Sequence, residues 1–138
     1  MSDLVRMSFT IDRSLYEQIE GLMKAGRCTN RSEFLRDLIR EHLVARQWEA
    51  NKETLCTLTL VYDHHKRRLA EKLTDIQHRH HGSVLAAMHV HLDEDLCAEA
   101  VLMKGRANDL IHVSDEMRRQ KGVLHAVLSQ STAGGSVR

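Results

Sequence analysis

The sequence predicts an α+β protein made of two parts, and three observations carry this prediction. Apolar and polar residues alternate strictly at positions 5–11, which is typical of a strand with one buried face. Two stretches with helical spacing of apolar residues follow directly. Between residues 55 and 128 the chain shows a β-α-β-β-α-β succession of patterns. The pattern changes near the only tryptophan, so we expect domains at 1–48 and 49–130 and a disordered tail at 131–138.

Composition narrows the possible functions. The 138 residues include 20 Lys and Arg and 19 Asp and Glu, so a DNA-binding function must rest on where the basic residues lie and not on bulk charge. Three cysteines without a CxxC pair indicate free thiols in a reducing cytoplasm. No apolar run has the length of a signal region or a membrane span. We therefore expect a cytoplasmic protein without a membrane partner.

The alternating segment 5–11 has a polar face formed by Arg6, Ser8 and Thr10. A lone strand would leave its backbone groups unpaired, so we expect two chains to pair these strands antiparallel in an obligate dimer. The resulting two-stranded ribbon fits the major groove of DNA, where Arg can read guanine and hydroxyls can read adjacent base edges. The alternative interpretation is an edge strand whose polar face lies in water.

Two amphipathic helices are expected after this strand. Ser14 and Glu17 predict a capping box for the first helix, and Gly26 predicts its end. The second helix begins at Asn30-Arg31-Ser32-Glu33, where a Glu again follows a capping residue by three positions. The N-terminus of such a helix can bind a phosphate through its backbone N–H groups. In the strand-helix-helix context, this start favours DNA binding over a solvated strand.

The second part has the order of a ferredoxin-like fold. We expect its strands at 55–62, 83–92, 96–103 and 123–128, and its helices at 64–77 and 107–120. The connection around residues 45–51 either continues the second helix or forms a hinge.

A candidate metal site lies in this second part. His89 and His91 are two residues apart and would share one face of a strand, and a hairpin would return Cys97 close to His91. His78 is a fourth candidate, supplied by the same chain or by a second protomer. A thiolate with imidazoles suits Zn, Cu and Ni; a planar set would favour Ni(II) or Cu(II), and a tetrahedral set Zn. The alternative is a His-x-His pair on an exposed strand beside a structural cysteine.

Together these features resemble the nickel-responsive repressor family of the NikR type, over about residues 5–128. The resemblance implies that the second domain is a ferredoxin-like, ACT-type domain that binds metal and forms the tetramer. The stretches that carry the resemblance are Asn30-Arg31-Ser32-Glu33, Tyr62-Asp63-His64-His65-Lys66-Arg67, Gln77-His78-Arg79-His80-His81, His89-Val90-His91 and Cys97-Ala98-Glu99-Ala100-Val101-Leu102.

The resemblance implies a role for each matching position. His89, His91 and Cys97 would bind Ni(II) from one subunit, and His78 from another across the tetramer interface, in a square-planar set. The groups that would orient these ligands are Tyr62, His64 and Glu99. The DNA contacts would be Arg6, Ser8 and Thr10 on operator bases, Asn30, Arg31 and Ser32 at the helix start, and Lys66 and Arg67 on the DNA backbone. Glu33 and Asp37 would help form a cation site between the domains; the alternative is an ordinary solvated helix face.

The resemblance implies a nickel-responsive, sequence-specific transcriptional regulator that represses nickel uptake genes. It would be a homotetramer, a dimer of dimers, in which Ni(II) at the tetramer interface promotes binding to double-stranded operator DNA. We expect no enzymatic activity, because Glu99 is the only acid–base candidate beside the ligands. The alternative is a ribbon-helix-helix regulator whose second domain responds to Cu, Zn, Co, a small molecule or a partner protein.

Three positions depart from the family pattern. Arg79 interrupts the usual run of histidines, and Gly82 stands where an acidic residue is common. His78, the first histidine of the run, is retained, so the implied ligand set is complete. Ser8 replaces a threonine seen in some relatives, so the resemblance does not carry over an operator sequence.

Overall fold

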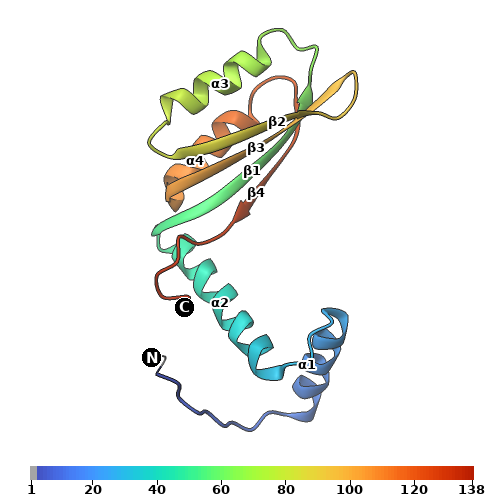
Figure 1. Cartoon of the computed structure of the whole chain (residues 1–138), viewed down its shortest axis with the longest axis vertical. Helices are drawn as coiled ribbons and strands as arrows, with labels where there is room; N and C mark the ends of the chain where they lie inside the picture. The colour runs from blue at the N-terminus through green and yellow to red at the C-terminus, as the bar shows by residue number, and fades with distance from the viewer. Residues whose placement is uncertain (1–2) are drawn as a thin grey trace. The chain divides into compact units, whose positions relative to one another are not determined.

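The computed structural model describes residues 3–138. The chain divides into two compact units, Met1–Ile39 and Arg40–Arg138. The first unit contains helix α1 (Arg13–Ala25) and the beginning of helix α2 (Arg31–Glu49), and the second unit contains the rest of α2 and a sheet with two further helices (Figure 1).

The segment before α1 is extended and exposed. Residues 3–12 form no helix or strand, and the apolar side chains of Val5, Met7 and Phe9 are each more than 60% exposed. A strand is defined by hydrogen bonds to a neighbouring backbone, which one chain does not supply here. The strand expected at 5–11 is therefore not formed within the single chain, and the paired ribbon stays a prediction for the dimer.

The two helices of the first unit begin in different ways. Asp12 is the N-cap of α1 and makes no side-chain capping bond, so the capping box expected at Ser14 and Glu17 is wrong; the helix has already begun at Arg13. At α2, Asn30 Oδ1 accepts a hydrogen bond of 3.1 Å from the Glu33 N–H, which confirms the predicted cap. Gly26 ends α1 as expected, with its N–H bonded to the Leu22 carbonyl.

The second unit has the expected β-α-β-β-α-β order. Its elements are β1 (Glu53–Asp63), α3 (Leu69–Arg79), β2 (Val84–His91), β3 (Leu96–Arg106), α4 (Ala107–Arg118) and β4 (Val123–Gln130). All pairings are antiparallel, and the strand order β2-β3-β1-β4 is that of a ferredoxin-like sheet. Helices α3 and α4 lie on the same side of this sheet (Figure 1).

The core lies between the sheet and these two helices. Alternate residues of β1 and β3 point toward the helices, as the period of two in a strand requires. The buried apolar residues from the two strands are Cys56, Leu58, Leu60, Tyr62, Cys97, Val101 and Met103, and those from the two helices are Leu69, Leu73, Ile76, Ala107, Leu110, Val113 and Met117.

Helix α3 begins later than expected, at Leu69 instead of His64. The backbone N–H groups at the start of the segment are bonded elsewhere: His64 N–H donates to the Asp95 carbonyl at 2.7 Å, and His65 N–H to Asp63 Oδ1 at 2.8 Å. Arg68 then takes a left-handed conformation with φ of 62°. Residues 64–68 therefore form a loop that is tied to the β2–β3 turn.

The C-terminal segment contacts the end of α2. Trp48 Nε1 donates to the Ser131 carbonyl at 2.9 Å, and Thr132 Oγ1 donates to Gln47 Oε1 at 2.8 Å. The Ser131 N–H also donates to the Leu55 carbonyl. The expectation of disorder from residue 131 is therefore not met at Ser131 and Thr132, because the end of β4 places them next to hydrogen-bonding groups of α2 and β1.

Among the residues that the structure describes, no helix has the length and apolar character to cross a membrane.

Gly122 offers a test of how the 64–68 loop is held. Its φ is +104°, and a Cβ at this position would lie 2.5 Å from Lys66 Cγ and 2.9 Å from Leu69 Cδ2. We expect Gly122→Ala to lower the free energy of unfolding by about 1–3 kcal/mol, because it adds backbone strain and a collision. Chemical denaturation would measure this. Gly82→Ala is the matched control, since nothing lies within 4 Å of its Cβ; equal stability of both variants would contradict this account.

Candidate metal centre

The register of the sheet brings two rows of polar side chains to its helix-covered face. Cys97 on β3 is opposite His91 on β2 and Tyr62 on β1. One step along, Glu99 lies between His89 and Leu60. Residues two apart on a strand share a face, so both rows point the same way. This confirms the expected hairpin return of Cys97 to His91.

Three donor atoms come together around Cys97. Its Sγ lies 3.2 Å from His91 Nδ1 and 3.4 Å from His64 Nδ1, and the donor atoms of the three residues all lie within 4.8 Å of one another. Cys97 is fully buried, whereas both histidines are exposed. The site is thus a buried thiol covered by two imidazoles that an ion can reach from solvent. In the range 3–138 this is the only such group of three His, Cys, Asp or Glu residues.

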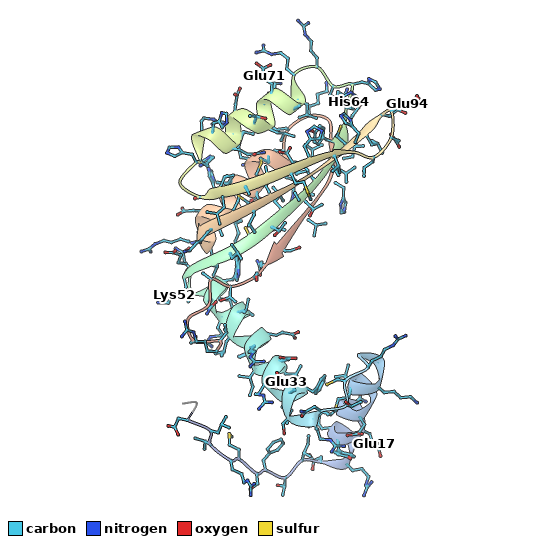
Figure 2. All side chains as sticks on the ribbon, in the orientation of Figure 1. Glu17, Glu33, Lys52, His64, Glu71 and Glu94 are labelled. Carbon is cyan, nitrogen blue, oxygen red and sulfur yellow. The ribbon has the colours of Figure 1, made fainter. Side chains whose placement is uncertain are left out.

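His64 reaches the cluster from the loop after β1. Figure 2 shows this residue at the same end of the sheet as the β2–β3 turn, where Glu94 lies. The backbone bond from His64 to Asp95 joins the loop to that turn, and His65 Nε2 lies 3.0 Å from Asp95 Oδ1. The turn is itself fixed, because Asp93 Oδ1 accepts hydrogen bonds from the N–H groups of Asp95 and Leu96, each at 2.8 Å.

His89 lies beside the cluster and not inside it. Its ring centroid is 5.3 Å from that of His91, and its Nδ1 lies 3.5 Å from the Tyr62 hydroxyl. Sequence reasoning placed His64 among the orienting groups, whereas the structure places it among the donors nearest to Cys97. The pairing of Tyr62 with Cys97 explains this position, because His64, two residues after Tyr62, must then lie near the start of β3.

Glu99 connects the second row to helix α3. Gln77 Nε2 donates to Glu99 Oε1 at 2.9 Å, and both residues are buried. Gln77 directly precedes His78, which is exposed in the last turn of α3 and lies outside the three-donor cluster. The end of α3 is therefore joined by a buried hydrogen bond to the row that contains His89.

Burial raises the pKa values of two side chains on β1, Tyr62 and Cys56. Burial, followed by the nearby Glu99 and Cys97, raises the pKa of Tyr62 to about 12, so its hydroxyl stays protonated at neutral pH. Burial alone raises the pKa of the Cys56 thiol to about 11, which keeps this cysteine unreactive in the core. Cys56 is therefore no competitor of Cys97 as a thiolate donor.

The donor types fit a transition metal. A thiolate with imidazoles suits nickel, copper and zinc, and the arrangement offers one sulfur from β3 with nitrogens from β2 and from the loop after β1. The Tyr62 hydroxyl and the Glu99–Gln77 pair are placed to orient the imidazole of His89 and the end of α3.

The expected DNA-contacting residues are all exposed. Arg6, Ser8 and Thr10 lie in the extended N-terminal segment, and Lys66 and Arg67 lie in the loop that also holds His64. At the start of α2, Asn30 caps the helix, and Arg31 Nε donates to Glu20 Oε1 at 2.9 Å. Ser32 is exposed beside them. These roles stay predictions.

The expected cation site at Glu33 and Asp37 also stays a prediction. Glu33 Oε2 accepts a hydrogen bond of 2.9 Å from Arg36 Nε, so this carboxylate is paired within its own helix. A cation at this position would have to share the Glu33 carboxylate with Arg36.

Known proteins resemble this chain along its whole length. Residues 55–131 match the family described as "NikR C terminal nickel binding domain", and residues 5–46 match "Ribbon-helix-helix protein, copG family". A protein of Geobacter sulfurreducens named "Putative nickel-responsive regulator" is 44% identical over 135 residues, which are 97% of each chain. A protein of Solibacter usitatus with the same name is 45% identical over 139 residues, with both chains fully covered.

A solved structure of an uncharacterized protein from Thermotoga maritima shares the fold. Its TM-score is 0.52 at 12% identity, and the match covers 57% of this chain and 98% of that chain. The likeness concerns the fold alone. The family of the present chain is shown instead by the two domain matches and by the relatives that align with nearly its whole length. This chain belongs to the nickel-responsive regulators of transcription, which join a ribbon-helix-helix DNA-binding domain to a C-terminal nickel-binding domain.

Proposed function

We propose that this regulator represses genes for nickel uptake, and that it binds its operator when Ni(II) is held around Cys97. The observation that carries the proposal is the meeting of the Cys97 thiol with imidazoles in a chain that also has a ribbon-helix-helix domain. A metal site and a DNA-binding domain in one chain allow metal availability to control operator binding. We propose no catalytic role for this chain. The family is regulatory, and the carboxylate next to the donors, Glu99, already accepts a hydrogen bond from Gln77.

As ligands we propose His89, His91 and Cys97 from one protomer, with His78 from a neighbouring protomer. The shared strand face of His89 and His91 and the pairing of His91 with Cys97 support the first three. The exposed position of His78 at the end of α3 supports its use by another chain. His64, 3.4 Å from the sulfur, would then stabilise the thiolate as an orienting neighbour.

Helix α3 provides a physical route from the metal to the DNA-contacting loop. Its apolar side packs into the core through Leu69, Leu73 and Ile76. His78 lies in its last turn, and the 64–68 loop with Lys66 and Arg67 immediately precedes its first residue. Holding His78 in a metal site would restrict α3 and this loop together. Such restriction favours operator binding only if the DNA-bound arrangement is the one that binds metal more tightly.

We propose a homotetramer, a dimer of dimers, as the working form. The sheet face away from the helices is apolar and exposed; Met88, Val90 and Val127 are 65%, 45% and 44% exposed. Exposed apolar surface of this kind is typical of protein–protein contacts. The unpaired N-terminal segments would form one ribbon per dimer, with Arg6, Ser8 and Thr10 on operator bases in two separated half-sites. DNA as the partner and three free cysteines support a cytoplasmic location.

Removal of the thiol tests the metal assignment. Cys97→Ala should abolish the thiolate-to-nickel charge-transfer band in an ultraviolet–visible titration and reduce nickel affinity by more than roughly 100-fold, since loss of an orienting group alone costs about 10–100-fold. Operator binding, measured by fluorescence anisotropy, should no longer depend on nickel. Cys28→Ala is the matched control, because this cysteine lies in the first unit. Nickel-dependent operator binding by Cys97→Ala would refute the assignment.

Two histidine variants distinguish the ligand from its neighbour. His89→Ala should remove a ligand and abolish the nickel spectrum of the wild-type protein. His64→Ala should keep that spectrum and weaken nickel binding by about 10–100-fold, as expected for an orienting group. The reverse result would show that the cluster seen around Cys97, with His64, is the ligand set itself.

Replacement of Arg6 tests the DNA contact independently of the metal. Arg6→Ala should cost about 1–3 kcal/mol of discrimination between the operator and scrambled DNA, because it removes a base-reading guanidinium. Nickel affinity should be unchanged. Lys24→Ala removes a positive charge from α1 without touching the ribbon segment, and it should weaken binding to both DNA sequences equally. Unchanged discrimination in Arg6→Ala would exclude this residue as a base contact.

A further inference from the structure

The last turns of α2 belong to the second unit, although most of this helix is matched by the ribbon-helix-helix family. The family match ends at residue 46, and the helix continues to Glu49. Trp48, in the last turn, is 6% exposed and packs in the core of the second unit. The contacts at the end of α2 therefore decide how firmly this helix is joined to the nickel-binding domain.

The buried indole of Trp48 depends on the C-terminal segment for its hydrogen bond. A buried indole N–H needs an acceptor, because an unpaired buried donor is destabilising. Trp48 Nε1 donates to the Ser131 carbonyl at 2.9 Å, and Ser131 lies 83 positions further along the chain. The Ser131 N–H donates in turn to the Leu55 carbonyl at 2.8 Å, next to the last pair of β1 with β4, Cys56 with Gln130. The pairing of these strands thus positions the acceptor of the indole.

Thr132 adds a second contact to the same turn of α2. Its Oγ1 donates to Gln47 Oε1 at 2.8 Å and accepts a hydrogen bond of 3.1 Å from the Gly134 N–H. The bond from Gly134 turns the segment back on itself, and Figure 1 shows the end of the chain next to α2. Two successive residues of α2, Gln47 and Trp48, are thus bonded to two successive residues of the C-terminal segment.

The turn that follows α2 is tied to helix α4. Asn51 takes a left-handed conformation with φ of 52°, and its Oδ1 accepts a hydrogen bond of 2.8 Å from the Asn108 N–H. The Lys52 carbonyl accepts a further bond of 3.1 Å from the Ala107 N–H. Both donors lie at the start of α4, where backbone N–H groups have no acceptor within the helix. The end of α2 is therefore held by two separate parts of the second unit.

We propose that Ser131 and Thr132 form a C-terminal strap, anchored on Trp48, that positions α2 on the nickel-binding domain. Energetic coupling between two sites is carried by packed side chains, hydrogen bonds and rigid elements, and the strap supplies such a connection at the end of the DNA-binding helix. The strap lies beside Cys56 of β1, whereas the thiolate cluster lies beside Tyr62, six residues further along the strand. At about 3.3 Å per residue the two places are roughly 20 Å apart, so the strap acts on α2 and leaves the metal donors untouched.

The fluorescence of Trp48, the only tryptophan in the sequence, tests the strap directly. A chain that ends at Gln130 lacks both strap residues. Its emission should shift to longer wavelength, and acrylamide should quench it more strongly, because the indole gains access to water. A chain that ends at Ala133 keeps both strap residues and is the matched control, so its emission should equal that of the full chain.

A pair of point variants repeats this test if the shortened chain fails to fold. Thr132→Val removes the hydroxyl that donates to Gln47 and should shift the Trp48 emission in the same direction by a smaller amount. Thr132→Ser keeps the hydroxyl and should leave the emission unchanged.

Operator binding distinguishes positioning of α2 from a general loss of stability. The chain that ends at Gln130 should keep the nickel affinity of the full chain, because the strap does not contact the donors. Its nickel-dependent gain in operator affinity should fall by at least about fivefold, the low end of usual coupling between two sites. This measurement rests on the proposed function: a full-length chain without any nickel-dependent gain would refute that function, and the fluorescence comparison would still decide the strap.

Three results would overturn the strap. The first is an unchanged emission and quenching of Trp48 in the chain that ends at Gln130. The second is equal emission of Thr132→Val and Thr132→Ser. The third is a loss of nickel affinity in the shortened chain as large as its loss of operator affinity, since that would indicate damage to the whole domain.

Discussion

The pairing of the central strand β3 with both of its neighbours is the constraint on which the rest depends. The register sets Cys97 between His91 and Tyr62, and Glu99 between His89 and Leu60. A slip of one residue would turn every side chain of a strand to the opposite face. The thiol would then leave the core and the histidines would leave its side of the sheet. Alternating burial along β1 and β3 makes such a slip costly, because it would expose the apolar set.

The same buried face contains a polar link that an apolar core alone would not require. The Gln77–Glu99 bond lies between α3 and β3, and breaking one partner would leave a buried polar group unsatisfied. This makes the end of α3 sensitive to events in the row of His89. The bond thus ties the end of α3, where His78 lies, to the strand β3 that contains Cys97.

The two units differ in how complete they are. The second unit buries a continuous core between its sheet and two helices. The first unit leaves Val5, Met7 and Phe9 exposed on an extended segment that pairs with no strand among residues 3–138. Assembly is thus the natural completion of the first unit, and the exposed apolar sheet face gives the second unit a surface for the same purpose. Both features support a regulator that works as an oligomer.

Local patterns in the sequence determined the element order, the alternation that buries β1 and β3, the cap at Asn30 and the shared face of His89 and His91, because these depend on backbone periodicity and near neighbours. Only the tertiary structure decided that His64 contacts Cys97, that α3 begins at Leu69 and that Ser131 bonds to Trp48. These contacts join residues far apart in the chain. They depend on strand register and on which backbone groups the folded chain brings within hydrogen-bonding distance, and no local spacing in the sequence contains that information.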